Sequence, residues 1–440
     1  MVRTSRLAPV TAALMASVAI PATALAQSVT QELGQEAQSN FARDRNVAVR
    51  ERPHPEYEAI GARVGGFMLF PRIEGDILYD TNVFATPSNT QGDTIFRVKP
   101  DVSLVSNWNR HFLQLQAGAD IGNYSRFSSE NTVDWNAAAL GRLDFAARTK
   151  LTGQIRHDRV TEARSSDNGG ILGAALPKPV RYDDDNARLT LSKEFNRLKL
   201  TGDASWDQTR YANDGPFQLN LRDRTQTMGM GRADYALSPA TALFVEVSAN
   251  NRDYRLHPAG IKQPDSNGYL ALVGTNFELG HLARGEVGVG YESQNYHNSA
   301  FADVKGFGFR GKVEWFPSQL TTVTLDTSRS IEDSGILIPF GAQRTAGGFL
   351  YSQGSVKVDH ELLRNVIVTA NGGISQSQFK TINRTDDRYT FGLSGTYLMN
   401  RHIGINAGYT YLHQNSRGTN LYLGPRFSDN RVGASIIYQF

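Results

Sequence analysis

The sequence of 440 residues contains no cysteine, which excludes disulfide scaffolds, thiolate-bound zinc and cysteine nucleophiles. It also lacks an excess of either charge, since 46 Lys and Arg face 43 Asp and Glu, so there is no basic field for nucleic acid. Apolar runs are scarce as well. A mean hydropathy of -0.39 excludes a bundle of membrane-spanning helices, because each such helix needs about 20 mostly apolar residues.

The one long uncharged run lies near the N-terminus, from Leu7 to Ala26. It follows two arginines, contains Pro21 and ends in small residues. This pattern fits a secretory signal peptide over residues 1–26 better than a membrane helix. Residues 27–65 are polar and are interrupted by Pro53 and Pro55. They predict a periplasmic N-terminal tail, partly disordered or helical, outside the main fold.

From Gly66 to Phe440, apolar and polar residues alternate with a period of two, which is typical of β-strands with two different faces. Tyr389, Phe391 and Leu393, for example, point one way, and the polar residues between them point the other. Eight tight turns alternate with nine connections that are mostly longer and rich in Gly, Pro, Asn, Asp and Ser. The sequence therefore predicts 18 strands, with both ends of this region on the side of the tight turns.

This combination distinguishes a membrane barrel from a soluble sandwich. A barrel in a bilayer pairs every backbone group, has an apolar outer face and a polar lumen, and has short periplasmic turns and longer extracellular loops. We therefore predict an all-β fold: a transmembrane antiparallel β-barrel over residues 66–440, in the outer membrane of a Gram-negative envelope. Aromatic residues near the strand ends predict girdles at headgroup level. These are Phe145, Phe195, Tyr235, Trp315 and Phe316 beside tight turns, and Tyr124, Phe127, Tyr211, Tyr254 and Tyr296 beside long loops.

Residues 52–100, the WNRH motif at 108–111 and the AGAD motif at 117–120 resemble the outer-membrane β-barrel porins that are encoded with bacterial exopolysaccharide genes. The YDTNVF stretch at 79–84 looks like the first loop of that family. The final Tyr-Gln-Phe is similar to the terminal assembly signal of outer-membrane barrels, with Phe440 as its last residue. The likeness covers residues 52–440 and is strongest before residue 170. It implies passage of a polymer through the outer membrane, with the barrel assembly machinery and periplasmic polysaccharide export components as partners.

The inward positions inferred from the alternation carry both signs of charge, and the lumen of a barrel this wide keeps such charges hydrated. They fit a path for a hydrated sugar polymer. Any water-filled barrel also needs a polar wall, however, and no preferred charge of the cargo follows. The predicted pore-lining residues are Arg97, Lys99, Asp101, Asp120, Arg142, Asp144, Arg156, Asp158, Lys199, Asp203, Asp207, Arg310, Lys312, Glu314, Lys357 and Asp359.

The longest loop, from Thr161 to Tyr182, has an apolar centre and two prolines. An exposed loop gains little from such a centre, so this one predicts a constriction or plug inside the pore, with an external flap as the alternative. The loop from Glu332 to Gly348, with its apolar stretch at 336–340, is the second candidate.

Asp183, Asp184 and Asp185 are candidates for binding divalent cations or bridging lipopolysaccharide. A solvated acidic strand end explains them better, because no Asp-x-Asp-x-Asp-Gly loop follows. Neither a Gly-x-Ser-x-Gly elbow nor a His-Glu-x-x-His motif occurs, so we predict no enzyme, cofactor or metal site. Outer-membrane lipid and lipopolysaccharide are the expected surroundings.

Three functions remain open at this point. We favour a conduit for exopolysaccharide export. The alternatives are a general or substrate-specific diffusion porin for small solutes, and a structural or adhesive barrel.

Overall fold

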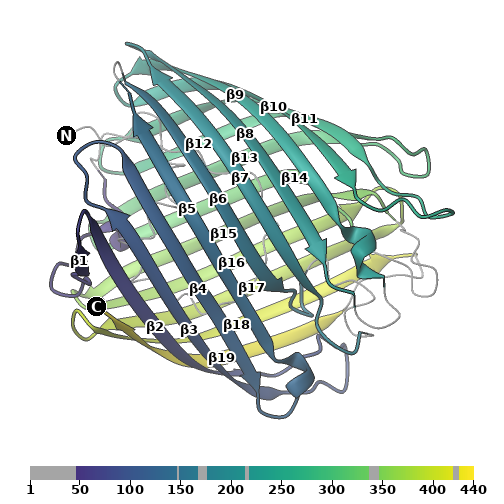
Figure 1. Ribbon diagram of the computed structural model, residues 1–440, viewed down its shortest axis with the longest axis horizontal. Helices are drawn as coiled ribbons and strands as arrows, with labels where there is room; N and C mark the ends of the chain where they lie inside the picture. The colour runs from purple at the N-terminus through teal and green to yellow at the C-terminus, as the bar shows by residue number, and fades with distance from the viewer. Residues whose placement is uncertain (1–45, 146–147, 167–175, 214–217, 336–345, 420–425) are drawn as a thin grey trace.

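The computed structural model describes residues 46–145, 148–166, 176–213, 218–335, 346–419 and 426–440. Eighteen strands, β2 to β19, form one closed antiparallel barrel, because β19 pairs with β2 (Figure 1). Among the residues described, no helix is long and apolar enough to cross a membrane. The predicted signal peptide lies outside the described residues.

The elements follow one another in a simple up-and-down order, and each strand from β2 onward pairs with its neighbours in sequence. They are η1 (Val49–Glu51), β1 (Ala62–Val64), β2 (Phe67–Asp80), β3 (Asp93–Ser106), β4 (Phe112–Tyr124), η2 (Ser128–Glu130), β5 (Thr132–Asp144), β6 (Thr149–Thr161), β7 (Arg181–Glu194), β8 (Leu198–Tyr211), η3 (Leu219–Arg222), β9 (Arg224–Ser238), β10 (Thr241–Tyr254), β11 (Ser266–Leu279), β12 (Ala283–Tyr296), β13 (Val304–Ser318), β14 (Thr321–Asp333), β15 (Gly348–Leu363), β16 (Val366–Phe379), β17 (Arg384–Leu398), β18 (Ile403–Gly418) and β19 (Phe427–Gln439).

Residues that alternate between apolar and polar in the sequence alternate between the outer and the inner face of the barrel wall. In β10, Leu243, Val245 and Val247 are about half exposed, whereas Phe244 and Glu246 between them are buried. Apolar side chains therefore stand on the outside of the barrel, where lipid covers them. The charged and amide side chains line the inside.

The connections have the predicted asymmetry of length, and the predicted number of strands is confirmed. Tight turns lie at one end of the barrel, with β1 and the C-terminus (Figure 1), and we call this the short-turn end. The opposite end, with the longer connections, is the long-loop end. One of the nine connections predicted from the sequence, residues 380–386, is wrong in its extent, because the chain leaves β16 at Phe379 and enters β17 at Arg384. Arg384 and Asp386 already belong to β17 and form a buried ion pair.

β1 was not predicted. It forms a small hairpin with the start of β2, and Gly65 makes the turn with a φ of +59°, which glycine adopts without strain.

The aromatic positions divide between the two ends. Phe145, Phe195, Tyr235 and Trp315 are exposed beside the tight turns, as a girdle requires. The girdle predicted beside the long loops is wrong for Tyr254 and Tyr296, which are buried. Both lie at inward positions of their strands. Tyr296 packs with Phe301, Val304, Ile331 and Leu350 in an apolar cluster under the loops. Exposed aromatic residues of that half include Tyr79, Phe96, Trp135, Tyr269, Tyr291, Phe307 and Tyr389.

Candidate functional site: the barrel lumen

The inner wall carries the charges that the alternation placed there. In β3, Arg97 and Lys99 alternate with Phe96 and Val98, which are exposed on the outside. The same phase holds along the other strands. The structure places on the inner face Arg97, Lys99, Asp101, Asp120, Arg142, Asp144, Arg156, Asp158, Lys199, Asp203, Asp207, Arg310, Lys312, Glu314, Lys357 and Asp359.

Many of these charges form pairs two residues apart on the same strand. The Arg156 Nε atom lies 2.5 Å from Asp158, and the Lys357 Nζ atom lies 3.3 Å from Asp359. Because side chains i and i+2 share one face of a strand, this spacing lets neighbours neutralise each other along the wall. Arg142 repeats the arrangement, with its Nε atom 3.2 Å from Asp144.

Other pairs cross from strand to strand. Arg97 donates hydrogen bonds to Asp120 of β4 through its Nε atom and one terminal nitrogen. The Lys99 Nζ atom lies 2.5 Å from Asp76 of β2. The inner wall is therefore strongly polar but largely neutralised, with cations and anions in alternating contact.

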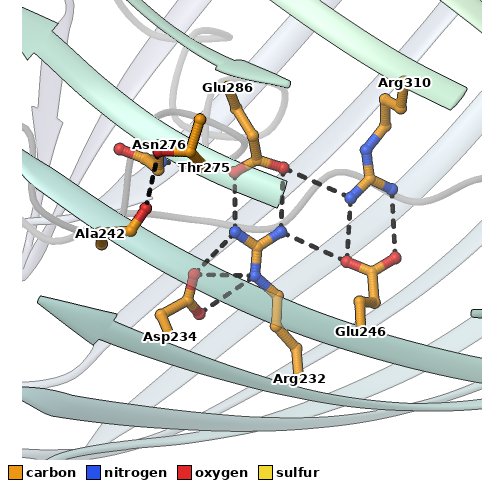
Figure 2. Close-up of polar contacts among 8 residues, drawn as sticks. All are labelled: Arg232, Asp234, Ala242, Glu246, Thr275, Asn276, Glu286 and Arg310. Atoms are coloured by element: carbon orange, nitrogen blue, oxygen red, sulfur yellow. Dashed lines mark hydrogen bonds and ion pairs between the residues drawn. The ribbon is translucent and has the colours of Figure 1, made fainter. Parts of the chain in front are cut away.

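The densest group of charges lies on β9, β10, β12 and β13 and is shown in Figure 2. Arg232 is bound by Asp234 at 2.7 Å, by Glu286 at 2.7 Å and by Glu246 at 3.3 Å. Arg310 closes the group from β13 through Glu246 at 2.9 Å and Glu286 at 3.4 Å. We call these five residues the Arg232 cluster.

Only Arg310 of this cluster was predicted. A signal for the rest exists in the sequence, because Arg232 and Asp234 repeat the Arg-x-Asp spacing of Arg142 and Asp144. Glu246 lies directly opposite Arg232 in the pairing of β9 with β10, so the strand register brings these two together. The contact with Glu286 reaches across β10 and β11 to β12, and no local pattern in the sequence reveals it.

The short-turn end is lined by the N-terminal segment. Residues 46–58, which we call the inner segment, lie against the inner wall from β11 to β19. The Arg50 Nε atom lies 2.6 Å from Asp359, and Arg52 lies 2.7 Å from Glu361. Val49 has no exposed surface, and its backbone N–H donates to Thr322 at 2.9 Å.

Further contacts hold both ends of the inner segment. Arg284 of β12 lies 2.6 Å from Glu51, and Tyr57 packs on Leu398 and Ile437. The expectation that this stretch lies outside the main fold is therefore wrong for residues 46–58. Arginines in a polar stretch suit a solvated tail, but they also suit a charged inner wall.

At the long-loop end, the described part of the 161–182 loop folds into the lumen. Arg164 is buried, with its Nε atom 2.6 Å from Glu130. The carbonyl of Ser165 accepts a hydrogen bond from Arg388, and its hydroxyl accepts one from Arg431 at 3.4 Å. Since Arg388 and Arg431 belong to β17 and β19, the loop spans the lumen from β6, as a constriction requires.

The second predicted loop, 332–348, contributes Asp333. This carboxylate lies 2.7 Å from Arg252, accepts a hydrogen bond from the Tyr254 hydroxyl at 3.0 Å, and also binds Arg224. Of the apolar centre of the first loop, residues 171–176, only Leu176 is described, and it is buried with Val180 and Leu219. The apolar centre of the second loop, residues 336–340, lies outside the described residues.

Arg222, in the connection from β8 to β9, links this connection to the 161–182 loop. Its guanidinium lies 3.2 Å from Glu162 and 4.1 Å from the centre of the Tyr211 ring. Burial opposes the charge of this group, but attraction by Tyr211 and Glu162 prevails and raises the pKa of Arg222 above its ordinary value. Arg222 therefore stays charged and ties the loop of β6 to the loop of β8.

The three acidic residues that the sequence offers as a cation site, Asp183 to Asp185, do not face the same way. Asp184 faces inward and accepts a hydrogen bond from Thr209 at 2.8 Å, whereas Asp183 and Asp185 face outward. The three carboxylates do not converge, and within the described ranges no group of three or more His, Asp or Glu has the arrangement of a metal site. Phe440 is half exposed on the outer face beside His402.

The profile of the family described as "Putative beta-barrel porin 2" matches residues 54–440, which is nearly the whole barrel. The chain belongs to this porin family. No curated protein matches the sequence.

Among solved structures, the chain is similar to the copper transporter OprC, with 11% identity and a TM-score of 0.47 over 87% of this chain and 82% of that one. It is also similar to OccAB3 of Acinetobacter baumannii, with 10% identity and a TM-score of 0.46 over 86% and 100% of the two chains. A BenF-like porin from Pseudomonas fluorescens Pf-5 is 12% identical, with a TM-score of 0.45 over 84% of this chain and 99% of that one.

A porin-family barrel of this kind resides in the outer membrane. Its short-turn end faces the periplasm and its long-loop end faces the cell exterior. The porin thus carries the inner segment at its short-turn end and the loop constriction at its long-loop end.

Proposed function

We propose that this porin is a conduit for exopolysaccharide export across the outer membrane. The observation that carries the proposal is the neutralised polar wall of the lumen. Many of its charges are bound to opposite charges on the same or the next strand, as in Arg97 with Asp120 and Arg156 with Asp158. Such a wall offers hydrogen bonds to a hydrated sugar chain without presenting a row of like charges that would retain ions.

The resemblance of residues 52–170 to porins encoded with exopolysaccharide genes supports the same proposal. In this proposal the N-terminal region of the mature chain lies in the periplasm, where polysaccharide export components would deliver the polymer. The barrel assembly machinery would recognise the C-terminal end at Phe440. Transport would need no covalent chemistry and no cofactor.

Deleting the gene tests the proposal directly. We expect the mutant to lose surface polysaccharide while its uptake of small solutes stays normal, and complementation with the intact gene to restore the polymer. Secretion of normal amounts of polymer by the deletion strain would refute export as the function.

The constriction at the external mouth favours one alternative, a diffusion porin for small solutes. The contacts of Ser165 with Arg388 and Arg431 span the lumen and narrow the path. Liposome-swelling assays separate the two functions. A diffusion porin admits small sugars and amino acids at rates that fall steeply with solute size, whereas an export conduit with its loops in place admits them poorly.

A further inference from the structure

The outer face of the barrel has a groove across β5 to β8 with a volume of about 520 Å³. Its floor consists of small outward residues. Gly141 and Gly153 lie opposite each other on β5 and β6, and a Cβ atom added at Gly141 would meet nothing within 4 Å. Larger side chains stand beside this floor: Ile155, Leu189 and Trp206. The groove is therefore an apolar channel that is open to the lipid.

A polar cluster adjoins the groove on its external side. In β6 the outward residue after Ile155 is His157, and the next is Arg159. On β7 these two pair with carboxylates: the His157 Nδ1 atom lies 2.8 Å from Asp185, and the Arg159 Nε atom lies 2.8 Å from Asp183. The groove and the cluster thus form one continuous surface on the same strands.

Cations exceed anions on this surface. Arg181 and Arg210 are exposed at outward positions of β7 and β8, and Arg210 donates to the side chain of Gln208. Neither guanidinium forms an ion pair with a carboxylate in the part of the chain that the structure describes. With Arg159 there are three arginines beside the carboxylates of Asp183 and Asp185.

The cluster lies at a level of the wall where β10 and β12 carry no charge on their outer face. Counted from the first residue of each strand at the short-turn end, His157 occupies the same position in β6 as Tyr291 in β12 and Ala249 in β10. Those strands are therefore aromatic or apolar at a depth where β6 is polar. Trp135, whose ring centre lies 4.6 Å from that of His157, also places the cluster at the level of the lipid headgroups.

We propose that this surface binds a lipopolysaccharide molecule. An acyl chain would occupy the groove, and a phosphate of the lipid would bind Arg159 and Arg210, because a guanidinium matches phosphate oxygens in geometry and charge. Asp183 holds Arg159 in position for this contact. Lipopolysaccharide is the occupant because the cluster faces the external leaflet, where the phosphorylated lipid of a Gram-negative outer membrane is lipopolysaccharide. The proposal does not depend on the cargo of the pore.

The test uses the full-length porin purified in mild detergent from its own outer membrane, with bound lipid measured by native mass spectrometry. We expect the wild type to retain lipopolysaccharide, and an Arg159→Gln, Arg210→Gln double variant to retain at least about tenfold less, because each arginine supplies charge-assisted hydrogen bonds. Gly141→Leu should reduce retention by filling the groove, and the open space at this position lets the variant fold. Arg417→Gln is the matched control, since Arg417 forms an outward ion pair with Asp387 on β17 and β18, away from the groove.

Three results would overturn the proposal. The first is equal lipopolysaccharide retention by the wild type and the double variant, with folding of both verified by the heat-dependent shift of the barrel on electrophoresis. The second is equal binding of phosphatidylglycerol vesicles and lipopolysaccharide vesicles by the delipidated protein. The third is a dimer of the porin that Gly141→Leu dissociates, which would assign the groove to a second copy of this chain.

Discussion

Arg232 lies flat on the ring of Phe244, with 3.9 Å between its guanidinium carbon and the ring centre. The ring in turn lies over Gly274 on β11 and Gly288 on β12, the two positions next to it across the sheet. A Cβ atom at Gly274 would come within 2.4 Å of the ring. Two glycines that belong to no recognisable motif therefore allow the ring, and through it Arg232, to lie against the wall.

Gly274→Ala should destabilise the barrel, because the added methyl group has no space between Phe244 and the carbonyl of Val287. Overpacking of this kind typically costs about 1–3 kcal/mol. Urea titration of the folded barrel in lipid vesicles measures the change. Gly229→Ala on β9 is the control, since nothing lies within 4 Å of a Cβ there. Equal stability of the two variants would contradict the packing argument.

Arg232→Gln should have a larger effect. The substitution removes the cation that Asp234 binds and leaves Glu246 and Glu286 with Arg310 alone. Removing one partner of a buried ion pair typically costs about 3–5 kcal/mol. The same urea titration measures the loss. Arg417→Gln removes an arginine whose side chain is 60% exposed, and it should cost no more than about 1 kcal/mol. A loss for Arg232→Gln within that range would mean that water in the lumen replaces the guanidinium at little cost.

The alternation in the sequence was sufficient to predict the wall. A strand has only two faces, so once Phe96 and Val98 are assigned to lipid, Arg97 and Lys99 must face inward. A different argument, nearness to a loop, places Tyr254 and Tyr296 in a girdle, and this argument is wrong. Their parity along the strand, not their distance from the loop, decides that they face inward.

The contacts that cross the lumen could not be predicted. Ser165 and Arg388 are far apart in sequence, and a polar loop or a polar tail has no periodicity that selects inside or outside. The sequence also does not show where a strand ends once it has left the membrane. Arg384 and Asp386 belong to β17, yet both faces of the strand are polar there, so the sequence resembles a loop.

Deleting residues 165–178 should raise the single-channel conductance in planar bilayers, because the loop spans the lumen at its external mouth. Arg388→Gln is a milder version that removes the hydrogen bond to the Ser165 carbonyl and should increase conductance fluctuations. Arg156→Gln is the control, since Arg156 also faces inward but binds Asp158 on its own strand. Unchanged conductance after the deletion would show that the loop does not restrict the path.

If residues 46–58 lie against the inner wall, cysteines introduced there should be protected from labelling, which would not be so in a free tail. Since the chain has no cysteine, a single introduced cysteine can be labelled without background. Val49→Cys should react with a hydrophilic maleimide at least about tenfold more slowly than Ile60→Cys, because Val49 has no exposed surface, whereas Ile60 is 60% exposed, and labelling at 49 requires local opening.

Adding Arg50→Gln and Arg52→Gln to the Val49→Cys variant should abolish most of this protection. The two substitutions break the pairs with Asp359 and Glu361 that hold the segment to β15. The same pair of substitutions should leave the labelling rate at Ile60→Cys unchanged, because Ile60 is already exposed. Rapid labelling of Val49→Cys in the otherwise unaltered chain would mean that residues 46–58 leave the inner wall in solution. The periplasmic mouth would then be wider than the structure has it.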